Sequence, residues 1–216
     1  MPLPMVHLRI AFQLATQLDR FPSSAFLLGS IAPDAIHMRV GADGLTKRIV
    51  HLNEPTDTIE HDAIRELLHQ YSQMKAPLLH FAAGYAAHLL ADRLWNRMII
   101  QPMQARCVTS IDAPTLRALY YEETDQLDFN LYHRMPWRSQ AWDLLDQAIA
   151  PDFPPLLTAQ EVNLWRQQTL QWFDKLKQEP KIVPQYITDN DVASYTREAV
   201  AAIGQQFSNW NLYDYL

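Results

Sequence analysis

Residues 78–100 constrain the fold most strongly, because they form a helical segment that is apolar on every side. Hydrophobic side chains recur at every angle around the helix axis in His80-Phe-Ala-Ala-Gly-Tyr-Ala-Ala-His88-Leu-Leu-Ala-Asp92-Arg-Leu-Trp-Asn96. A helix that is hydrophobic all round is buried on all sides in a globular protein. The segment therefore predicts a central helix with other elements packed around it.

His88 and Asp92 lie four residues apart inside this helix and project from one face of it. Burying a carboxylate is costly unless another group pairs with it. A metal ion would satisfy both side chains at once, whereas the structural alternative is a His–Asp hydrogen bond that only fixes helix packing. Gly84, one turn earlier on the same stripe, would leave room for a close neighbour.

The rest of the chain also follows a helical period, and its 5 glycines are too few for the turns of an all-β protein. Ser23 or Ser24 would open a short helix that stops near Gly29. The stretch 30–55 contains several prolines and glycines and is predicted to be irregular, as functional loops often are. Further helices are expected over residues 5–18, 56–74, 78–100, 114–132, 139–150, 158–178 and 189–207. The 216 residues predict a single all-α domain, 1–216.

Net charge and cysteine content limit the partners and the metal ligands that the protein can have. The formal net charge of -6 argues against extended nucleic-acid binding, although one nucleotide in a metal site stays compatible with it. Cys107 is the only cysteine, so any metal must be held by nitrogen and oxygen. No apolar run reaches the roughly 20 residues of a membrane span, and no signal peptide is convincing. A cytoplasmic location is therefore expected, and a homo-oligomer is left open.

His7 and Asp34 extend the candidate site. His7 shares the inward face of the first helix with Ala11 and Leu14. A lone core histidine is ordinarily structural, but two inward histidines and an inward aspartate on separate helices favour a metal site. Asp34 directly follows a proline just past a helix end, where it either points into a site or forms a local turn. His51 alone is an ordinary loop histidine.

Taken in order, these pieces resemble the bacterial zinc-dependent phospholipase C family, which belongs to the all-helical superfamily of the S1/P1 nucleases. They are His7, Gly29-Ser-Ile-Ala-Pro-Asp34, His51-Leu and Gly84-Tyr-Ala-Ala-His88-Leu-Leu-Ala-Asp92-Arg-Leu-Trp95. The resemblance covers roughly the first 100 residues and implies an all-α fold of the phospholipase C/P1 nuclease type. It also implies that His7 and Asp34 bind one metal and that His51, His88 and Asp92 bind a neighbouring one. Asp34 or Asp92 would bridge or act as the base, with Asp34 the candidate that orients or deprotonates water.

Two departures from secreted family members bear on the number of metals. Those enzymes use a processed N-terminal amine as a ligand and carry a further His-x-x-x-Glu pair, and neither is found here. One or at most two metals are expected, with zinc first and manganese, iron or nickel also suited to His/Asp ligands. Asp125 and Asp128 share a helical stripe and are additional candidate ligands. The alternative for these two carboxylates is a solvated acidic face.

The expected function is a metal-dependent phosphoesterase that uses a metal-activated water. Its substrate would be a small phosphoester, a nucleotide or a lipid headgroup. One alternative is a non-catalytic metal-binding or scaffold descendant, suggested by the missing ligand pair and the aromatic tail 207–216. A second is an HD-type phosphohydrolase at His61-Asp62, which the helical geometry disfavours because Asp62 lies roughly opposite the apolar face around Leu67.

Overall fold

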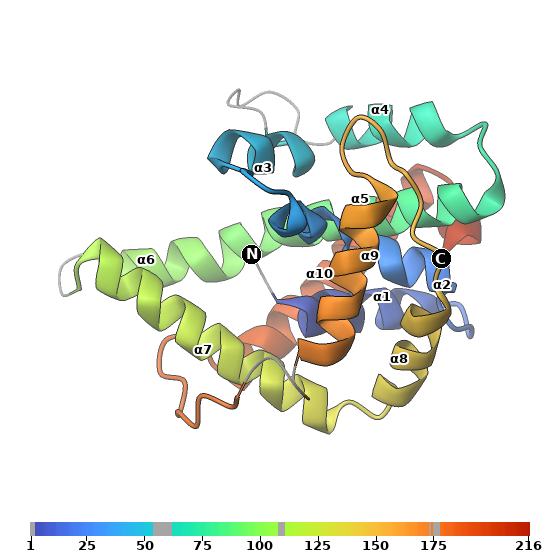
Figure 1. Cartoon of the computed structure of the whole chain (residues 1–216). Helices are drawn as coiled ribbons and strands as arrows, with labels where there is room; N and C mark the ends of the chain where they lie inside the picture. The colour runs from blue at the N-terminus through green and yellow to red at the C-terminus, as the bar shows by residue number, and fades with distance from the viewer. Residues whose placement is uncertain (1–2, 54–61, 108–110, 173, 175–177) are drawn as a thin grey trace.

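The computed structural model describes residues 3–53, 62–107, 111–172, 174 and 178–216, and every regular element within them is a helix (Figure 1). The all-α prediction is therefore confirmed. The elements are α1 (Pro4–Thr16), α2 (Ser24–Gly29), the 3-10 helix η1 (Ala32–Met38), α3 (Gly44–Val50), α4 (Asp62–Tyr71), α5 (Ala76–Trp95), the π-helical turn η2 (Asn96–Ile100), α6 (Gln101–Cys107), α7 (Ala113–Arg134), α8 (Arg138–Gln147), α9 (Ala159–Gln171), α10 (Asp189–Asn209) and the 3-10 helix η4 (Tyr213–Tyr215).

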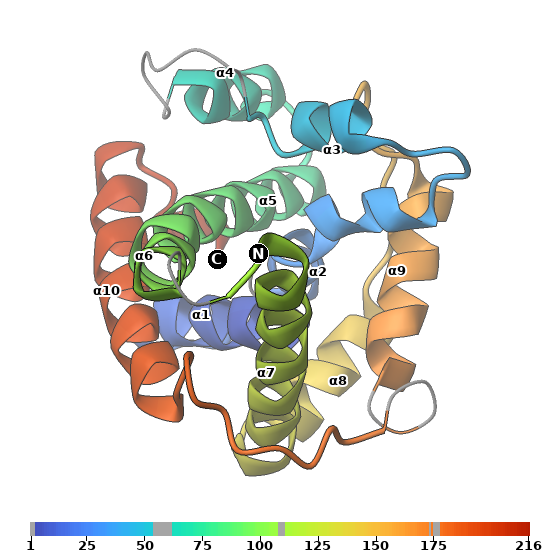
Figure 2. The same cartoon turned by 90° about the vertical axis from the view of Figure 1, so that its left-hand side faces the viewer.

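Helix α5 runs through the middle of the molecule, as its apolar circumference predicts. Figure 2 shows α10 and α9 on either side of it, α3 and α4 above it, and α1 and α7 below it. Its large side chains Phe81, Tyr85 and Trp95 are almost completely buried. None of the described helices is long and apolar enough to cross a membrane.

Helices α2 and α5 approach each other most closely at two glycines. A Cβ atom on Gly84 would lie 2.1 Å from the carbonyl oxygen of Phe26, and one on Gly29 would lie 2.1 Å from that of Phe81. Both obstacles are backbone atoms, so a larger residue fits only if the two helices separate. The expectation that Gly84 leaves room for a close neighbour is confirmed, and the neighbour is α2.

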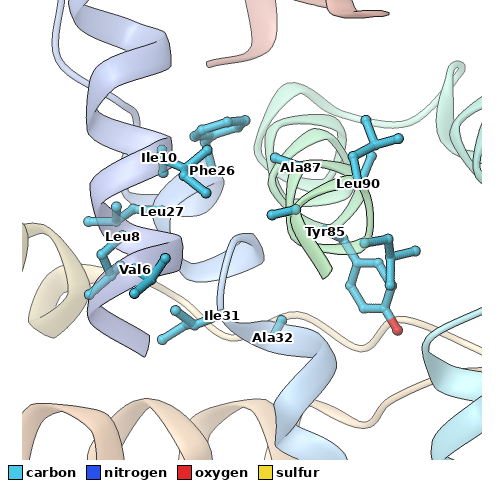
Figure 3. Close-up of a cluster of buried hydrophobic side chains, with 14 of the residues drawn as sticks. Val6, Leu8, Ile10, Phe26, Leu27, Ile31, Ala32, Tyr85, Ala87 and Leu90 are labelled. Atoms are coloured by element: carbon cyan, nitrogen blue, oxygen red, sulfur yellow. The ribbon is translucent and has the colours of Figure 1, made fainter. Parts of the chain in front are cut away.

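Helix α1 packs against the same pair. Figure 3 shows Ile10 of α1 beside Phe26 of α2, across from Ala87 of α5. These side chains belong to one continuous cluster of buried hydrophobic residues. Helices α1, α2 and α5 therefore form a tightly packed frame, and two of them carry predicted site residues.

The stretch predicted to be irregular, 30–55, contains two short helices, so that prediction is wrong in part. Pro33 lies in the first turn of η1, where its missing N–H costs nothing. Asp43 caps α3 by accepting a hydrogen bond from the backbone N–H of Thr46 at 2.7 Å. Pro33 and Gly44, two of the residues that suggested a loop, lie instead in the first turns of helices.

The remaining helices lie close to their predicted positions. The short helix begins after its capping residue Ser23, whose Oγ accepts from the N–H of Phe26. The start predicted for 56–74 lies outside the described residues, and the helix is described from Asp62 onward. At the end of the chain the aromatic tail docks onto its own domain, where Leu216 is buried and the Tyr213 hydroxyl donates to the Gly204 carbonyl at 2.8 Å.

Candidate metal centre

Five side chains from four elements meet in the interior: His7 of α1, Asp34 of η1, His51 at the end of α3, and His88 and Asp92 of α5. The two carboxylates lie between the imidazoles. Asp92 is 3.6 Å from Nε2 of His7, 3.6 Å from Nε2 of His88 and 3.7 Å from Nε2 of His51. Asp34 is 3.6 Å from Nε2 of His51. The five residues singled out in the sequence therefore do come together.

The cluster divides into two overlapping groups that share His88. His7, His88 and Asp92 form one, and Asp34, His51 and His88 form the other, with the candidate ligand atoms of each group within 4.8 Å of one another. His7 was expected to act with Asp34, but it faces Asp92 and stacks on His88 with ring centroids 3.7 Å apart. The two groups with a common member offer places for one or two ions, and the number of ions stays a prediction.

Backbone carbonyls fix the orientation of two of the imidazole rings. His88 donates from Nδ1 to the carbonyl of Ser30 at 2.9 Å, and His51 donates from Nδ1 to the carbonyl of Lys47 at 3.0 Å. A ring that donates from Nδ1 carries its lone pair on Nε2, the atom that faces the carboxylates here. Metal-binding histidines are commonly held in this way. Sequence reasoning missed Ser30 and Lys47 because any residue offers a carbonyl.

The donor set fits a divalent metal ion. Among the described residues, several buried atoms of the cluster have no hydrogen-bond partner: both ring nitrogens of His7, Nε2 of His51, Nε2 of His88, Oδ1 of Asp34 and Oδ1 of Asp92. Buried polar atoms are nearly always hydrogen-bonded, so this concentration is abnormal for a structural network. Two ligands bound at about 2.1 Å to a tetrahedral ion lie about 3.4 Å apart, close to the 3.6 Å found between Asp92 and the rings of His7 and His88.

Burial and charge set the protonation of the cluster. Burial and the neighbouring His88 lower the pKa of His7 to about 4. Burial raises the pKa of Asp34, but the interaction with His51 and the charge of His88 outweigh it and bring the pKa to about 2. Asp92 follows the same pattern, and its pKa lies well below the usual value. Neutral imidazoles and ionised carboxylates are the forms that bind metals.

His88 differs from its neighbours. Burial lowers its pKa, but the charge of Asp92 outweighs burial, so the pKa is raised above the usual value for histidine. A metal ion at Nε2 would therefore displace a proton that Asp92 otherwise stabilises there.

Solvent reaches the cluster on the carboxylate side. The side chains of Asp34 and Asp92 retain 8% and 11% exposure, whereas that of His88 retains none. His37 lies at this opening with its side chain 47% exposed and Nε2 3.8 Å from Asp34. Sequence reasoning missed His37, although its spacing of three residues from Asp34 places both on one side of η1.

The C-terminal half supports the elements that carry the cluster. Tyr195 of α10 donates to the carbonyl of Ala91, the residue before Asp92, at 2.8 Å. Glu161 of α9 accepts two hydrogen bonds from Arg39, which directly follows η1, at 2.6 and 3.0 Å.

Asp128 of α7 belongs to this support. It is fully buried, and its Oδ2 accepts from the backbone N–H of Met5 at 3.3 Å in the first turn of α1. The alternative of a solvated acidic face is therefore wrong for Asp128, and Asp125 is only partly exposed. Neither carboxylate belongs to the two described groups, so their role as additional ligands stays a prediction. His61 and the side chain of Asp62 lie outside the described residues.

One family model matches the chain, that of the zinc dependent phospholipase C family, over residues 6–95. The match contains all five clustered side chains. Residues 6–95 are therefore similar to the zinc dependent phospholipase C family. No curated protein and no solved structure matches the chain. The zinc dependence of the family and the donor set of the cluster agree on a divalent metal, with zinc first, as the cofactor.

The matched segment ends at Trp95, the last residue of α5. It therefore holds every residue of the candidate metal centre. The carboxylates and hydroxyls of α7, α9 and α10 that support the centre from outside all lie beyond it.

Proposed function

We propose that this protein is a metal-dependent phosphoesterase that hydrolyses a small phosphoester with water, and that residues 1–216 form the single domain that carries this activity. One observation carries the proposal: buried nitrogen and oxygen atoms of five side chains face one another without hydrogen-bond partners among the described residues. Such an arrangement is unfavourable without a cation and favourable with one. The match to a zinc dependent phospholipase C family supports a phosphoester as the substrate class.

The residues divide into ligands and a water-orienting group. His7, His88 and Asp92 would hold one ion, and Asp34, His51 and His88 offer a second, overlapping set. A bound divalent ion supplies Lewis acidity, which polarises a phosphoryl oxygen and makes water more acidic. The chain's contribution is to hold these donors in place before substrate arrives, since Ser30 and Lys47 already fix two of the rings.

Asp34 is our candidate for orienting the attacking water. Its Oδ1 has no hydrogen-bond partner among the described residues, and its carboxylate lies on the side of the cluster that solvent reaches. An ionised carboxylate accepts the hydrogen bond of a water and so directs the lone pair of that water toward a bound phosphoryl group.

Elemental analysis and turnover test the proposal together. Purified protein should contain zinc or another divalent ion, and it should hydrolyse p-nitrophenyl phosphate or bis-p-nitrophenyl phosphate until a chelator is added. His88→Ala and Asp92→Ala should lose both the bound ion and nearly all turnover. His69→Ala is the matched control, because His69 is an exposed histidine of α4.

Two results would contradict the proposal. Protein without any bound ion and without turnover in any divalent metal would remove the enzyme altogether. Full metal content without turnover would instead favour a non-catalytic, metal-binding descendant of the family.

A further inference from the structure

The ammonium group of Lys47 lies next to His37, at the opening of the metal centre. Nε2 of His37 is 3.8 Å from Oδ1 of Asp34 on one side and 3.2 Å from Nζ of Lys47 on the other. One imidazole therefore separates the ammonium of Lys47 from the carboxylate assigned to the attacking water. Both His37 and Lys47 lie where the cluster meets solvent.

The backbone of Lys47 is held in place, and among the described residues no carboxylate neutralises its ammonium. Its own carbonyl holds the ring of His51, so its backbone cannot shift without disturbing the cluster. Among the described residues no carboxylate pairs with its ammonium, which donates only to the imidazole of His37. Arg39, the cation just after η1, is by contrast committed to Glu161 and to the carbonyl of Leu156.

Trp165 places an unmet donor beside His37. Its ring centroid lies 6.0 Å from that of His37, and its side chain belongs to α9. Trp165 is only 7% exposed, and its indole Nε1 is buried without a hydrogen-bond partner among the described residues. A buried indole N–H ordinarily finds an acceptor. A ligand rich in acceptor oxygens that binds beside His37 would satisfy the ammonium of Lys47, whereas the indole N–H is buried away from solvent.

We propose that Lys47, positioned by His37, binds a terminal phosphoryl oxygen of the substrate, so that the site prefers phosphomonoesters to phosphodiesters. The inference rests on the proposed phosphoesterase function and specifies its substrate class. A phosphomonoester carries a charge of about −1.5 to −2 and three terminal oxygens near neutral pH, whereas a diester carries about one charge and two free oxygens. An ammonium beyond the ion-binding groups matches the additional charge and the third oxygen.

Kinetic comparison of two esters tests the proposal. The values of kcat/KM for p-nitrophenyl phosphate and bis-p-nitrophenyl phosphate are measured for the wild type, Lys47→Met and Arg48→Met. Methionine keeps the length and apolar character of the stem, removes the charge and leaves the carbonyl bonded to His51 in place. Arg48 is the control, because it is the exposed cation next in the same helix.

The expected result is a selective loss. Lys47→Met should lose about ten- to a hundredfold on the monoester, the effect of one charge-assisted hydrogen bond. It should lose less than about threefold on the diester, and Arg48→Met should leave both values unchanged. Equal losses on the two esters would overturn the proposal, because Lys47 would then act only through His51, and so would no loss on either.

Binding of inorganic phosphate separates this inference from the proposed function. Calorimetric titration of the zinc-loaded protein with phosphate should show binding that Lys47→Met weakens at least about tenfold. If no ester is turned over but this difference is present, the phosphoesterase fails and the phosphate subsite stands. If the wild type and Lys47→Met bind phosphate equally, or if neither binds it, the subsite is refuted whatever the turnover.

Discussion

Gly84→Ala should destabilise the protein and weaken metal binding at the same time. An alanine Cβ at this position would lie 2.1 Å from the carbonyl oxygen of Phe26 and 2.9 Å from the backbone nitrogen of Ser30, where ordinary contacts begin at 3.4 Å. Helices α2 and α5 would have to separate by roughly 1 Å. Overpacking costs about 1–3 kcal/mol, and rigid backbone obstacles place this case near the upper end.

Helix propensity offsets part of that cost. Replacing an interior helical glycine by alanine gains about 1 kcal/mol, so the net loss is about 2 kcal/mol. For a chain of 216 residues this corresponds to a fall in Tm of about 4–8 °C. Displacement of Ser30 would also lengthen the 2.9 Å bond that its carbonyl accepts from His88, and loss of such a contact weakens metal affinity by about ten- to a hundredfold.

Differential scanning calorimetry and zinc titration measure the two effects. Gly29→Ala should reproduce the fall in Tm, because its Cβ meets the carbonyl of Phe81 at the same 2.1 Å. Gly44→Ala is the matched control, since no atom lies within 4 Å of a Cβ there and its φ is not in the left-handed region. A Tm of Gly84→Ala equal to or above that of the wild type would refute the close-packing argument.

Three further predictions concern the ion and the supports of the site. Chelation should lower the Tm of wild-type protein, because an ion at a thousand times its Kd stabilises the native state by about 4 kcal/mol; His88→Ala should show no such shift, and an equal shift in both would argue against an ion at this cluster. The hydrogen bonds from Arg39 lower the pKa of Glu161 in the folded state, so their stabilisation is complete above the unfolded value of about 4.3 and is lost as the pH falls through the lower folded value. Denaturant unfolding should therefore show Glu161→Gln less stable by about 2 kcal/mol at pH 7, with the difference from wild type shrinking below about pH 4; a difference independent of pH would exclude this ion pair as its source. Asp128→Ala should cost about 1–3 kcal/mol in the same assay, because it leaves the amide of Met5 without its acceptor at the start of α1, whereas the exposed neighbour Glu122→Ala should change little.

The central helix could be predicted from sequence because one physical pattern determined it. Apolar side chains at every angle require burial on every side, and the spacing of His88 and Asp92 then places both on a single face. The inward direction of His7 followed from the same reasoning applied to α1. Periodicity thus predicts the inward direction of His7, His88 and Asp92.

Other features depend on contacts that periodicity does not encode. The carbonyls of Ser30 and Lys47 hold two imidazoles, yet any residue at those positions would supply the same atom. Asp128 lies on a stripe that reads as a polar surface, and only the arrival of α1 from the other end of the chain buries it. The short helices of 30–55 were missed because their prolines, glycines and aspartate serve both turns and helix starts.

The stacking of His7 on His88 joins two side chains that lie far apart in the sequence, which affects when a metal site can be complete. His7 precedes His88 in the chain, so its partner ring is made only after most of residues 6–95 have been synthesised. Until His88 has been made neither candidate group is complete, because both groups include it. An ion in the group of His7, His88 and Asp92 would also require α1 to have reached its final place, whereas the group of Asp34, His51 and His88 contains no residue of α1.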